Sequence, residues 1–323
     1  MTSITRRQWL ETTAAAGLAT IANPLNAARP PIEGRIIDAH VHIWSADTKK
    51  YPLMPGFTAN DFWYPSYSAE EVLAHGRPAG INRTNLVQMT WYGTDHTYII
   101  DVIKKYPGQF VGTGIVAAVT DVSLADPGRQ MTALAEDGIY AFRIRGKSTR
   151  PQLGDGGRWL DHPGYHTMFQ TGAEHNLALS FLMTPGDIPE LDRMCTKHPE
   201  TPVIIDHLCI LRPKDGKLVE EEVKAFLAMA KHKRVMVKVG AFYALGKKTP
   251  PYTDMLPLIK RVVEAYGPER CMWESDAPKQ DKNGHTFQAA VDTIKQHADF
   301  LSKSDKEQIL VRTAENFFFK RSK

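Results

Sequence analysis

Short apolar runs alternate with longer amphipathic stretches along most of the chain, beginning at Ile36. Eight such runs are present, and most are nearly continuous in apolar residues. Continuous apolar runs are typical of strands in a parallel sheet that helices cover on both faces. We predict strands over Ile36–Ile43, Thr84–Met89, Phe110–Ala117, Tyr140–Arg145, Ala178–Met183, Val203–Asp206, Val235–Val239 and Cys271–Glu274.

The stretches between these runs carry helix signals. Ser68 and Glu71 form a capping-box pattern before an apolar pair, and the segment 219–232 has Glu early and Lys late, which suits the helix dipole. Further helical patterns cover 95–106, 187–197, 253–266 and 286–301. Eight strand–helix alternations in fewer than 300 residues predict an α/β fold, a single-domain (β/α)8 TIM barrel. An open doubly wound sheet is disfavoured, because no glycine-rich dinucleotide fingerprint follows the first run.

The N-terminal segment has a different character from the rest of the chain. Arg6 and Arg7 precede a mildly apolar stretch over 13–22 and a small-residue region ending near Ala28. This order predicts a twin-arginine export signal over residues 1–28, and hence a periplasmic or secreted barrel over 29–323. The alternative is a disordered tail with a chance pair of arginines.

Composition narrows the class of partner. The chain is 42% hydrophobic with a net charge of +4 and no long basic run, so we expect no nucleic-acid partner. It contains no stretch of roughly 18 unbroken apolar residues, so we expect no stable membrane anchoring. Cys195, Cys209 and Cys271 are far apart and predict neither a disulfide framework nor a zinc knuckle. The expected partner is a small-molecule substrate, and the sequence does not determine the oligomeric state.

Three of the predicted strands end in residues that carry chemistry. The first contains His40 and His42, the sixth is followed by His207, and the eighth is followed by Asp276. Strand ends of a barrel meet at one face, so these side chains are expected to converge there. Neutral imidazoles at such a site bind a divalent metal or polarise a carbonyl. Taken singly, each histidine is equally explained as a core residue, and Asp276 as a helix N-cap.

With these motifs the sequence resembles the amidohydrolase superfamily, in particular the amidohydrolase-related branch that holds 2-pyrone-4,6-dicarboxylate lactonase and sugar-lactone hydrolases. The resemblance covers nearly the whole chain after the N-terminal segment. Its motifs are Ile37–Trp44, Ile139–Arg143, Ile205–Leu208, Val237–Gly240 and Trp273–Pro278.

The resemblance implies roles for the residues at the strand ends. Asp276 corresponds to the general base that activates water, and His40, His42 and His207 would polarise the scissile carbonyl or bind a metal. Many metal-dependent members carry a histidine or carbamylated lysine at the end of strand five, but the segment 178–184 has neither. A binuclear site is therefore not expected. The cofactor is either none or a single divalent metal such as zinc, held by His40, His42 and Asp276.

Several further residues are candidates for substrate binding. Arg143 and Arg145 share a face at the end of strand four, and Arg212 follows strand six. Guanidinium groups there would clamp a substrate carboxylate, or else pair with acidic residues of the loops. Trp91 and Tyr243 are candidate pocket walls, or else packing residues.

Other positions stay open at this level. The aromatic-rich segment 44–67 follows the first strand and would form either part of the pocket or a packing plug. The direction of Lys238 on strand seven is not determined. Six other histidines fall in predicted loops or helices and are expected at the surface: His96, His162, His166, His175, His198 and His232.

The leading hypothesis is a hydrolase that opens a small carboxylated or polyhydroxylated lactone. The second hypothesis is a metal-dependent non-oxidative decarboxylase of the same superfamily, which the missing strand-five histidine disfavours. The third is a non-catalytic periplasmic protein that binds a small molecule.

Overall fold

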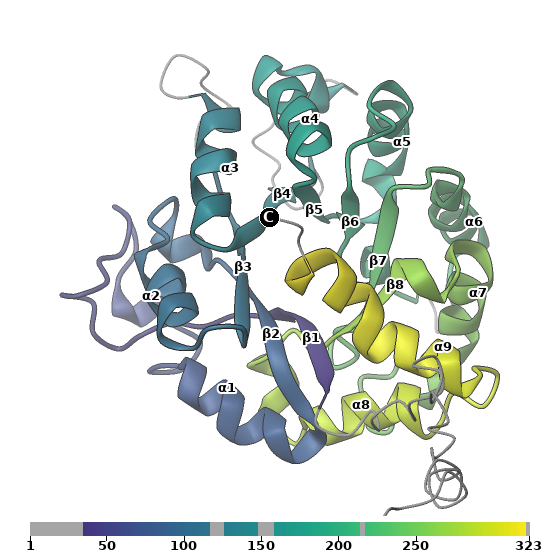
Figure 1. Cartoon of the computed structure of the whole chain (residues 1–323). Coiled ribbons are helices and arrows are strands. Elements are labelled where there is room, and N and C mark those ends of the chain that lie inside the picture. Colours follow the sequence, from purple (N-terminus) through teal and green to yellow (C-terminus); the bar gives the residue numbers. More distant parts are fainter. Residues whose placement is uncertain (1–34, 117–125, 148–157, 214–216, 321–323) are drawn as a thin grey trace, which may run out of the picture. The chain divides into compact units, whose positions relative to one another are not determined.

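The computed structural model describes residues 35–116, 126–147, 158–213 and 217–320, which belong to one compact unit. The proposed signal segment 1–28 lies outside the described residues. Within them, eight parallel strands form one sheet in chain order, a nearly closed TIM barrel (Figure 1), which confirms the predicted fold. The strands are β1 Ile36–Val41, β2 Ile81–Val87, β3 Phe110–Gly114, β4 Ile139–Arg145, β5 Ala178–Leu182, β6 Val203–Ile205, β7 Val235–Gly240 and β8 Cys271–Glu274.

Helices follow the strands and cover the outside of the barrel (Figure 1). They are α1 Ala69–Gly76, α2 Thr97–Lys105, α3 Pro127–Glu136, α4 Pro163–His175, α5 Ile188–Lys197, α6 Glu220–Ala228, α7 Leu256–Tyr266, α8 Phe287–Lys295 and α9 Lys303–Glu307. The predicted capping box is confirmed, because Ser68 accepts from the Glu71 N–H and Glu71 accepts from the Ser68 N–H. The helices α6 and α8 end earlier than predicted. In the described part of the chain, no helix is long and apolar enough to cross a bilayer.

One end of the barrel is apolar and closed. Ala314, Phe317 and Phe318 of the C-terminal segment pack against residues at the starts of the strands, among them Ile37 and Met272. Figure 1 shows this segment, in yellow, lying across one end of the ring of strands. Polar chemistry is therefore confined to the opposite end, where the strands terminate.

The seam between β1 and β8 closes the barrel next to the predicted catalytic residues. The His42 N–H donates to the Ala277 carbonyl at 2.9 Å, and the Asp276 N–H donates to the His40 carbonyl at 3.0 Å. Asp276 has a φ of +62°, a left-handed conformation that Asp tolerates better than most residues. The seam thus fixes the Asp276 backbone beside both histidines of β1.

Candidate active site

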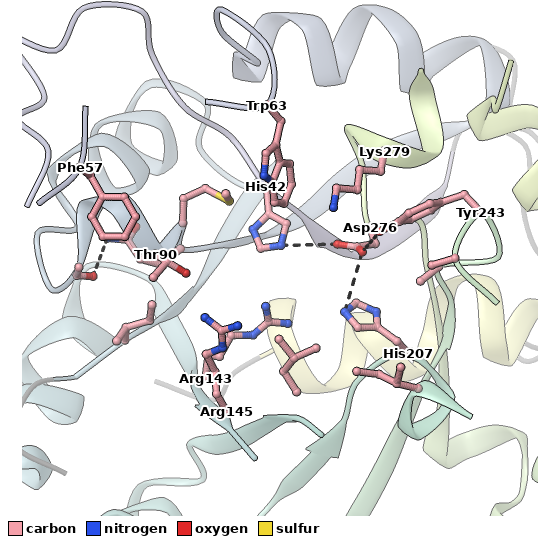
Figure 2. A pocket seen from close by; sticks show the side chains of 18 of the residues that line it. His42, Phe57, Trp63, Thr90, Arg143, Arg145, His207, Tyr243, Asp276 and Lys279 are labelled. Carbon is pink, nitrogen blue, oxygen red and sulfur yellow. Dashed lines mark hydrogen bonds and ion pairs between the residues drawn. The ribbon is translucent and has the colours of Figure 1, made fainter. Parts of the chain in front are cut away.

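A cavity of about 900 Å³ lies at the carboxyl ends of the strands (Figure 2). Its wall combines ionisable, aromatic and apolar side chains. They come from the carboxyl ends of the strands and from the segments that follow them. The described lining residues are His42, Met54, Phe57, Trp63, Gln88, Met89, Thr90, Gly93, Thr94, Ile115, Arg143, Arg145, Leu182, His207, Ile210, Arg212, Ala241, Tyr243, Ala244, Leu245, Asp276 and Lys279.

Three of the predicted catalytic side chains converge at the base of this cavity. His40 Nε2 lies 3.2 Å from His42 Nε2, and Asp276 Oδ1 lies 3.6 Å from the first and 3.5 Å from the second. His40 is fully buried, whereas His42 and Asp276 reach the cavity. The structure therefore brings together three side chains that the sequence predicted to converge.

His40 on β1 and His42 just after it are both held neutral. Burial lowers the pKa of His42 to about 4, although the charge of Asp276 opposes this shift. Burial, followed by the nearby charges of Lys238 and Arg143, lowers the pKa of His40 well below its usual value. The Nδ1 of His42 lies 2.8 Å from the Val87 carbonyl, to which it can only donate, so its Nε2 presents a lone pair toward Asp276.

His207 has the opposite character and carries charge more readily. Burial lowers its pKa, but the carboxylates of Glu274 and Asp276 outweigh burial and the net shift is upward. Glu274 Oε1 accepts from the His207 backbone N–H at 3.0 Å and lies 2.7 Å from Nδ1. The ring Nε2 then faces the cavity, 4.0 Å from Asp276 Oδ2.

The backbone at His207 is unusual. Four consecutive residues, His207 to Ile210, have φ between +48° and +58°, the left-handed region that costs non-glycine residues roughly 1–2 kcal/mol each. Such a conformation persists only where the surroundings impose it, and it concentrates at functional sites. Here the turn aims the His207 ring across the end of β6 toward β8.

A network of buried charges lies beneath His40. Lys238 Nζ donates to Asp206 Oδ1 at 2.9 Å, and Arg143 Nη2 donates to Asp206 Oδ2 at 2.7 Å. Ser180 also donates to Asp206 at 2.9 Å. Burial raises the pKa of Asp206, but Lys238 and Arg143 outweigh burial and hold it below its usual range. Lys238, whose direction the sequence left open, therefore points into the barrel.

Glu274 was not singled out in the sequence. It precedes Asp276 by two residues, and this spacing on a strand could have indicated that both side chains point to the same side. Its carboxylate is fully buried, with Oε1 on His207 and Oε2 at 3.1 Å from His40 Nδ1. Only glycine fits opposite it on β7, because a Cβ on Gly240 would lie 1.9 Å from the Glu274 carbonyl oxygen. Glu274 thus orients His207 through two contacts and places a carboxylate oxygen beside His40.

Tyr243 adds a second anchor for Asp276. Its hydroxyl donates to Asp276 Oδ2 at 2.5 Å, which leaves Oδ1 toward the histidines of β1. Burial and the charge of Asp276 raise the pKa of Tyr243 above its usual value, so the phenol keeps its proton. Tyr243, predicted as a pocket wall, lies directly on the site.

The donor atoms fit a single divalent cation. Tetrahedral zinc with bonds of about 2.0–2.1 Å separates its ligands by about 3.3 Å, close to the 3.2–3.6 Å among His40 Nε2, His42 Nε2 and Asp276 Oδ1. A bound metal would require each of these atoms to present a lone pair, and the group is one of two buried clusters in the described chain that could hold a metal. The Arg143 guanidinium, 3.2 Å from His40 Nε2, competes with a cation for the same lone pair.

The predicted substrate-binding residues divide into two groups. Arg143, Arg145, Arg212 and Tyr243 line the cavity, whereas Trp91 does not. Trp91 is 3% exposed and packs behind Trp63, at 5.8 Å between ring centroids.

The segment 44–67 contributes to both packing and the pocket. Trp44 and Tyr67 are buried, while Met54, Phe57 and Trp63 line the cavity. No motif or spacing singled out Trp63 or Lys279, and the Lys279 ammonium lies over the Trp63 ring at 4.0 Å.

One minor expectation was wrong. His96 is buried rather than exposed, and its Nε2 accepts from the Ile115 N–H at 3.0 Å. Burial lowers its pKa to about 4, so it remains a neutral acceptor.

Replacing Tyr243 by phenylalanine is expected to lower kcat/KM by about tenfold or more, because a hydrogen bond to a charged group contributes roughly 1.5–3 kcal/mol. Steady-state rates at pH 7 measure the effect. Tyr252→Phe is the matched control, because the Tyr252 hydroxyl bonds Gln280 and His285 outside the cavity. An unchanged kcat/KM in Tyr243→Phe would contradict this role.

Asp38 gives a prediction for stability against pH. Burial raises its pKa from 3.8 to about 7, although the Ser275 and His40 N–H groups donate to Oδ1. Between about pH 4 and 7 the folded protein keeps this proton and the unfolded chain releases it. The Asp38 carboxyl therefore lowers the free energy of unfolding by about 1.4 kcal/mol per pH unit as the pH rises.

Asp38→Asn keeps the acceptor and removes this titration. Its free energy of unfolding, relative to the unmodified protein, is expected to rise by about 3 kcal/mol between pH 4.5 and 7. Urea unfolding at both pH values measures the difference. A gap that stays constant across this window would show that Asp38 does not titrate there.

A TIM barrel whose strand ends bring histidines and carboxylates to one cavity defines an enzyme site. The profile of the Amidohydro_2 amidohydrolase family matches residues 37–320, so the chain belongs to this family of hydrolases.

Two characterised relatives are lactone hydrolases. The chain is 26% identical over 254 residues to the L-fucono-1,5-lactonase of Burkholderia ambifaria, covering 77% of this chain and 82% of the relative. It is 24% identical over 256 residues to the 4-sulfomuconolactone hydrolase of Hydrogenophaga intermedia, covering 79% and 78%.

Solved structures share the fold at lower identity. A probable 2-pyrone-4,6-dicarboxylic acid hydrolase from Acinetobacter baumannii has a TM-score of 0.70 at 22% identity, covering 88% of this chain and 99% of that chain. An amidohydrolase from Burkholderia multivorans holds zinc (TM-score 0.66, 14% identity, 88% and 99% coverage). A 5-carboxyvanillate decarboxylase from Novosphingobium aromaticivorans holds manganese (TM-score 0.55, 15% identity, 90% and 99% coverage).

Proposed function

We propose that this protein hydrolyses a small lactone that carries a carboxylate or several hydroxyl groups. The observation that supports this most directly is one carboxylate, Asp276, facing a cavity between a neutral histidine and a readily protonated one. His42 Nε2 lies 3.5 Å from Asp276 Oδ1, and His207 Nε2 lies 4.0 Å from Oδ2. The lactone hydrolases among the relatives add support for a cyclic ester as substrate.

Asp276 acts as the general base in this proposal. Its Oδ1 accepts a proton from water while the water oxygen attacks the lactone carbonyl carbon. When the bond from that carbon to the ring oxygen breaks, the same proton passes from Asp276 to the departing oxygen. The products are one hydroxy acid and no other fragment, so the atoms balance without a co-reactant.

His207 stabilises the negative charge that develops on the carbonyl oxygen. Glu274 favours its protonated form, and Nε2–H then donates into the cavity. Arg145 and Arg212 both line the cavity and would bind a substrate carboxylate through their guanidinium groups. When a divalent metal is bound by His40, His42 and Asp276, it supplies Lewis-acid polarisation of the carbonyl.

The test is proton release by the purified protein on a panel of pyrone-dicarboxylate and sugar lactones, before and after chelation. Asp276→Asn protein serves as the control for uncatalysed opening. Turnover that survives chelation assigns the polarisation to the protein's own side chains, and turnover lost on chelation and restored by zinc assigns it to the metal. No turnover on any lactone would overturn the proposal.

Assays for carbon dioxide release and for ligand binding separate the two alternative functions. Carbon dioxide released from aromatic acids would indicate the metal-dependent decarboxylase, whereas tight binding without turnover would indicate a binding protein. The absence of a histidine or lysine over residues 178–184, which include the end of β5, disfavours the decarboxylase.

We also propose that residues 1–28 direct export by the twin-arginine route. The support is the Arg6–Arg7 pair before a mildly apolar stretch. Replacing both arginines by lysine should retain the full-length protein in the cytoplasmic fraction, while the unmodified chain moves to the periplasmic fraction. Equal distribution of the two proteins would overturn export by this route.

A further inference from the structure

The cavity has an apolar wall that lies away from the general base. It is formed by the loops after β1 and β2, with further residues from the ends of β3 and β5. Its members are Met54, Phe57, Met89, Ile115 and Leu182. In Figure 2, Phe57 and Thr90 lie at the opposite side of the cavity from Asp276 and Tyr243, with Arg143 and Arg145 between them. The chemistry described above uses only the side of the cavity that holds Asp276.

This wall is held in place by backbone contacts. The Met54 N–H donates to the Trp91 carbonyl at 2.8 Å, and the Phe57 N–H donates to the Met54 carbonyl at 3.2 Å. A Cβ on Gly93 would lie 2.9 Å from the Met54 sulfur, so the two loops approach as closely as a glycine allows. The Ile115 N–H is fixed by His96. The wall is therefore largely formed before any ligand binds.

The exposure of two apolar side chains at this cavity, one of them from the apolar wall, points to a ligand. Three large hydrophobic side chains of the described chain are notably exposed, namely Met54 (40%), Trp63 (42%) and Phe300 (37%). Two of the three, Met54 and Trp63, line this cavity. Clustered apolar groups at a cavity mouth are typical of ligand-binding surfaces, whereas scattered ones need no explanation.

The size of the cavity agrees with a substrate larger than a single ring. About 900 Å³ is near the upper end of the roughly 300–1,000 Å³ found for pockets that hold drug-sized molecules. Thioether side chains such as Met54 and Met89 adapt to irregular shapes and contact aromatic rings favourably. Phe57 and Trp63 add aromatic surface of their own.

We propose that Met54, Phe57, Met89, Ile115 and Leu182 form an apolar subsite that binds an aryl substituent carried by the acidic lactone. This inference rests on the proposed lactonase function. The ring and its carboxylate lie against His207 and the arginines, and the aryl group extends toward Phe57. The subsite selects substrates by this substituent, while Asp276 performs the hydrolysis.

Binding of two dicarboxylates tests the subsite without requiring turnover. Succinate and 2-benzylsuccinate share their acidic groups and differ by one benzyl group. Isothermal titration of the full-length protein should show 2-benzylsuccinate binding about tenfold to thirtyfold more tightly, from the apolar area that the phenyl ring buries. The double variant Met54→Gln/Phe57→Gln should reduce the ratio of the 2-benzylsuccinate affinity to the succinate affinity to about threefold or less. Its affinity for succinate should stay within about twofold of that of the unmodified protein.

The matched control is Phe300→Gln, which removes an exposed phenylalanine that does not line the cavity. It should keep the ratio of the unmodified protein. A ratio near one in the unmodified protein, or a ratio that survives Met54→Gln/Phe57→Gln, would overturn the subsite, as would failure of both ligands to bind. Lactone turnover is measured separately. If no lactone is hydrolysed but 2-benzylsuccinate still binds more tightly than succinate by the expected ratio, the hydrolase function is rejected and the apolar subsite is retained.

Discussion

Replacing Asp276 by asparagine is expected to lower kcat by about 10³-fold, within the range that general-base catalysis contributes. The amide cannot accept the proton of the attacking water at neutral pH. Asparagine keeps the shape of the side chain and tolerates the φ of +62° at this position, so the fold and the Tyr243 contact should persist. Alanine at Asp276 should abolish turnover in the same way. Single-turnover rates and circular dichroism of the variants measure both parts of the expectation.

Asp281→Asn is the matched control for this substitution. Asp281 lies five residues further along the same loop, accepts from the Tyr67 hydroxyl at 2.9 Å, and does not line the cavity. We expect Asp281→Asn to retain activity within about threefold, since it removes no group from the reaction. Activity of Asp276→Asn within tenfold of the unmodified protein would remove Asp276 from the role of base.

The second large effect is expected for stability. Lys238→Met should lower the free energy of unfolding by about 3–5 kcal/mol, because it leaves the buried charge of Asp206 without one of its two cationic partners. The melting temperature should fall by roughly 10 °C, given about 2–4 °C per kcal/mol for chains somewhat shorter than this one. Urea unfolding at pH 7 gives the free energy directly.

The double variant Lys238→Met/Asp206→Asn distinguishes an unpaired charge from lost packing. If the cost arises from the unpaired carboxylate, the double variant should be less destabilised than the sum of the two single variants by at least about 1 kcal/mol. Additive effects would instead show that Lys238 and Asp206 stabilise the barrel independently, contrary to the 2.9 Å contact between them.

The convergence of the candidate catalytic residues could be predicted from the sequence because a parallel barrel places every strand end at the same face. His40, His42, His207 and Asp276 each lie at or just beyond such an end, and the structure brings all four together. The four side chains converge even though the pairing of β1 with β2 is irregular between Asp38 and Val41. The site centre depended on topology rather than on details of strand register.

The pairing of the buried charges could not be predicted from the order of the strands. Lys238, Asp206 and Arg143 come from three different strands, and periodicity along one strand does not specify which charge a neighbouring strand presents. Glu274 had a spacing signal, but its function depends on Gly240 leaving room across β7. These contacts are set by how the strands meet in three dimensions.

The sequence by itself therefore determined the barrel and the convergence of His40, His42, His207 and Asp276 at one of its ends. Alternating apolar runs and amphipathic stretches indicate which residues of each segment are buried. That pattern is enough to predict the strands, the helices and their order. Only the tertiary structure decided the charge state of each histidine, the left-handed turn at His207 and the apolar wall beside Phe57. Those properties depend on distances between segments far apart in the chain, and loops such as 44–67 carry no periodic pattern from which to infer them.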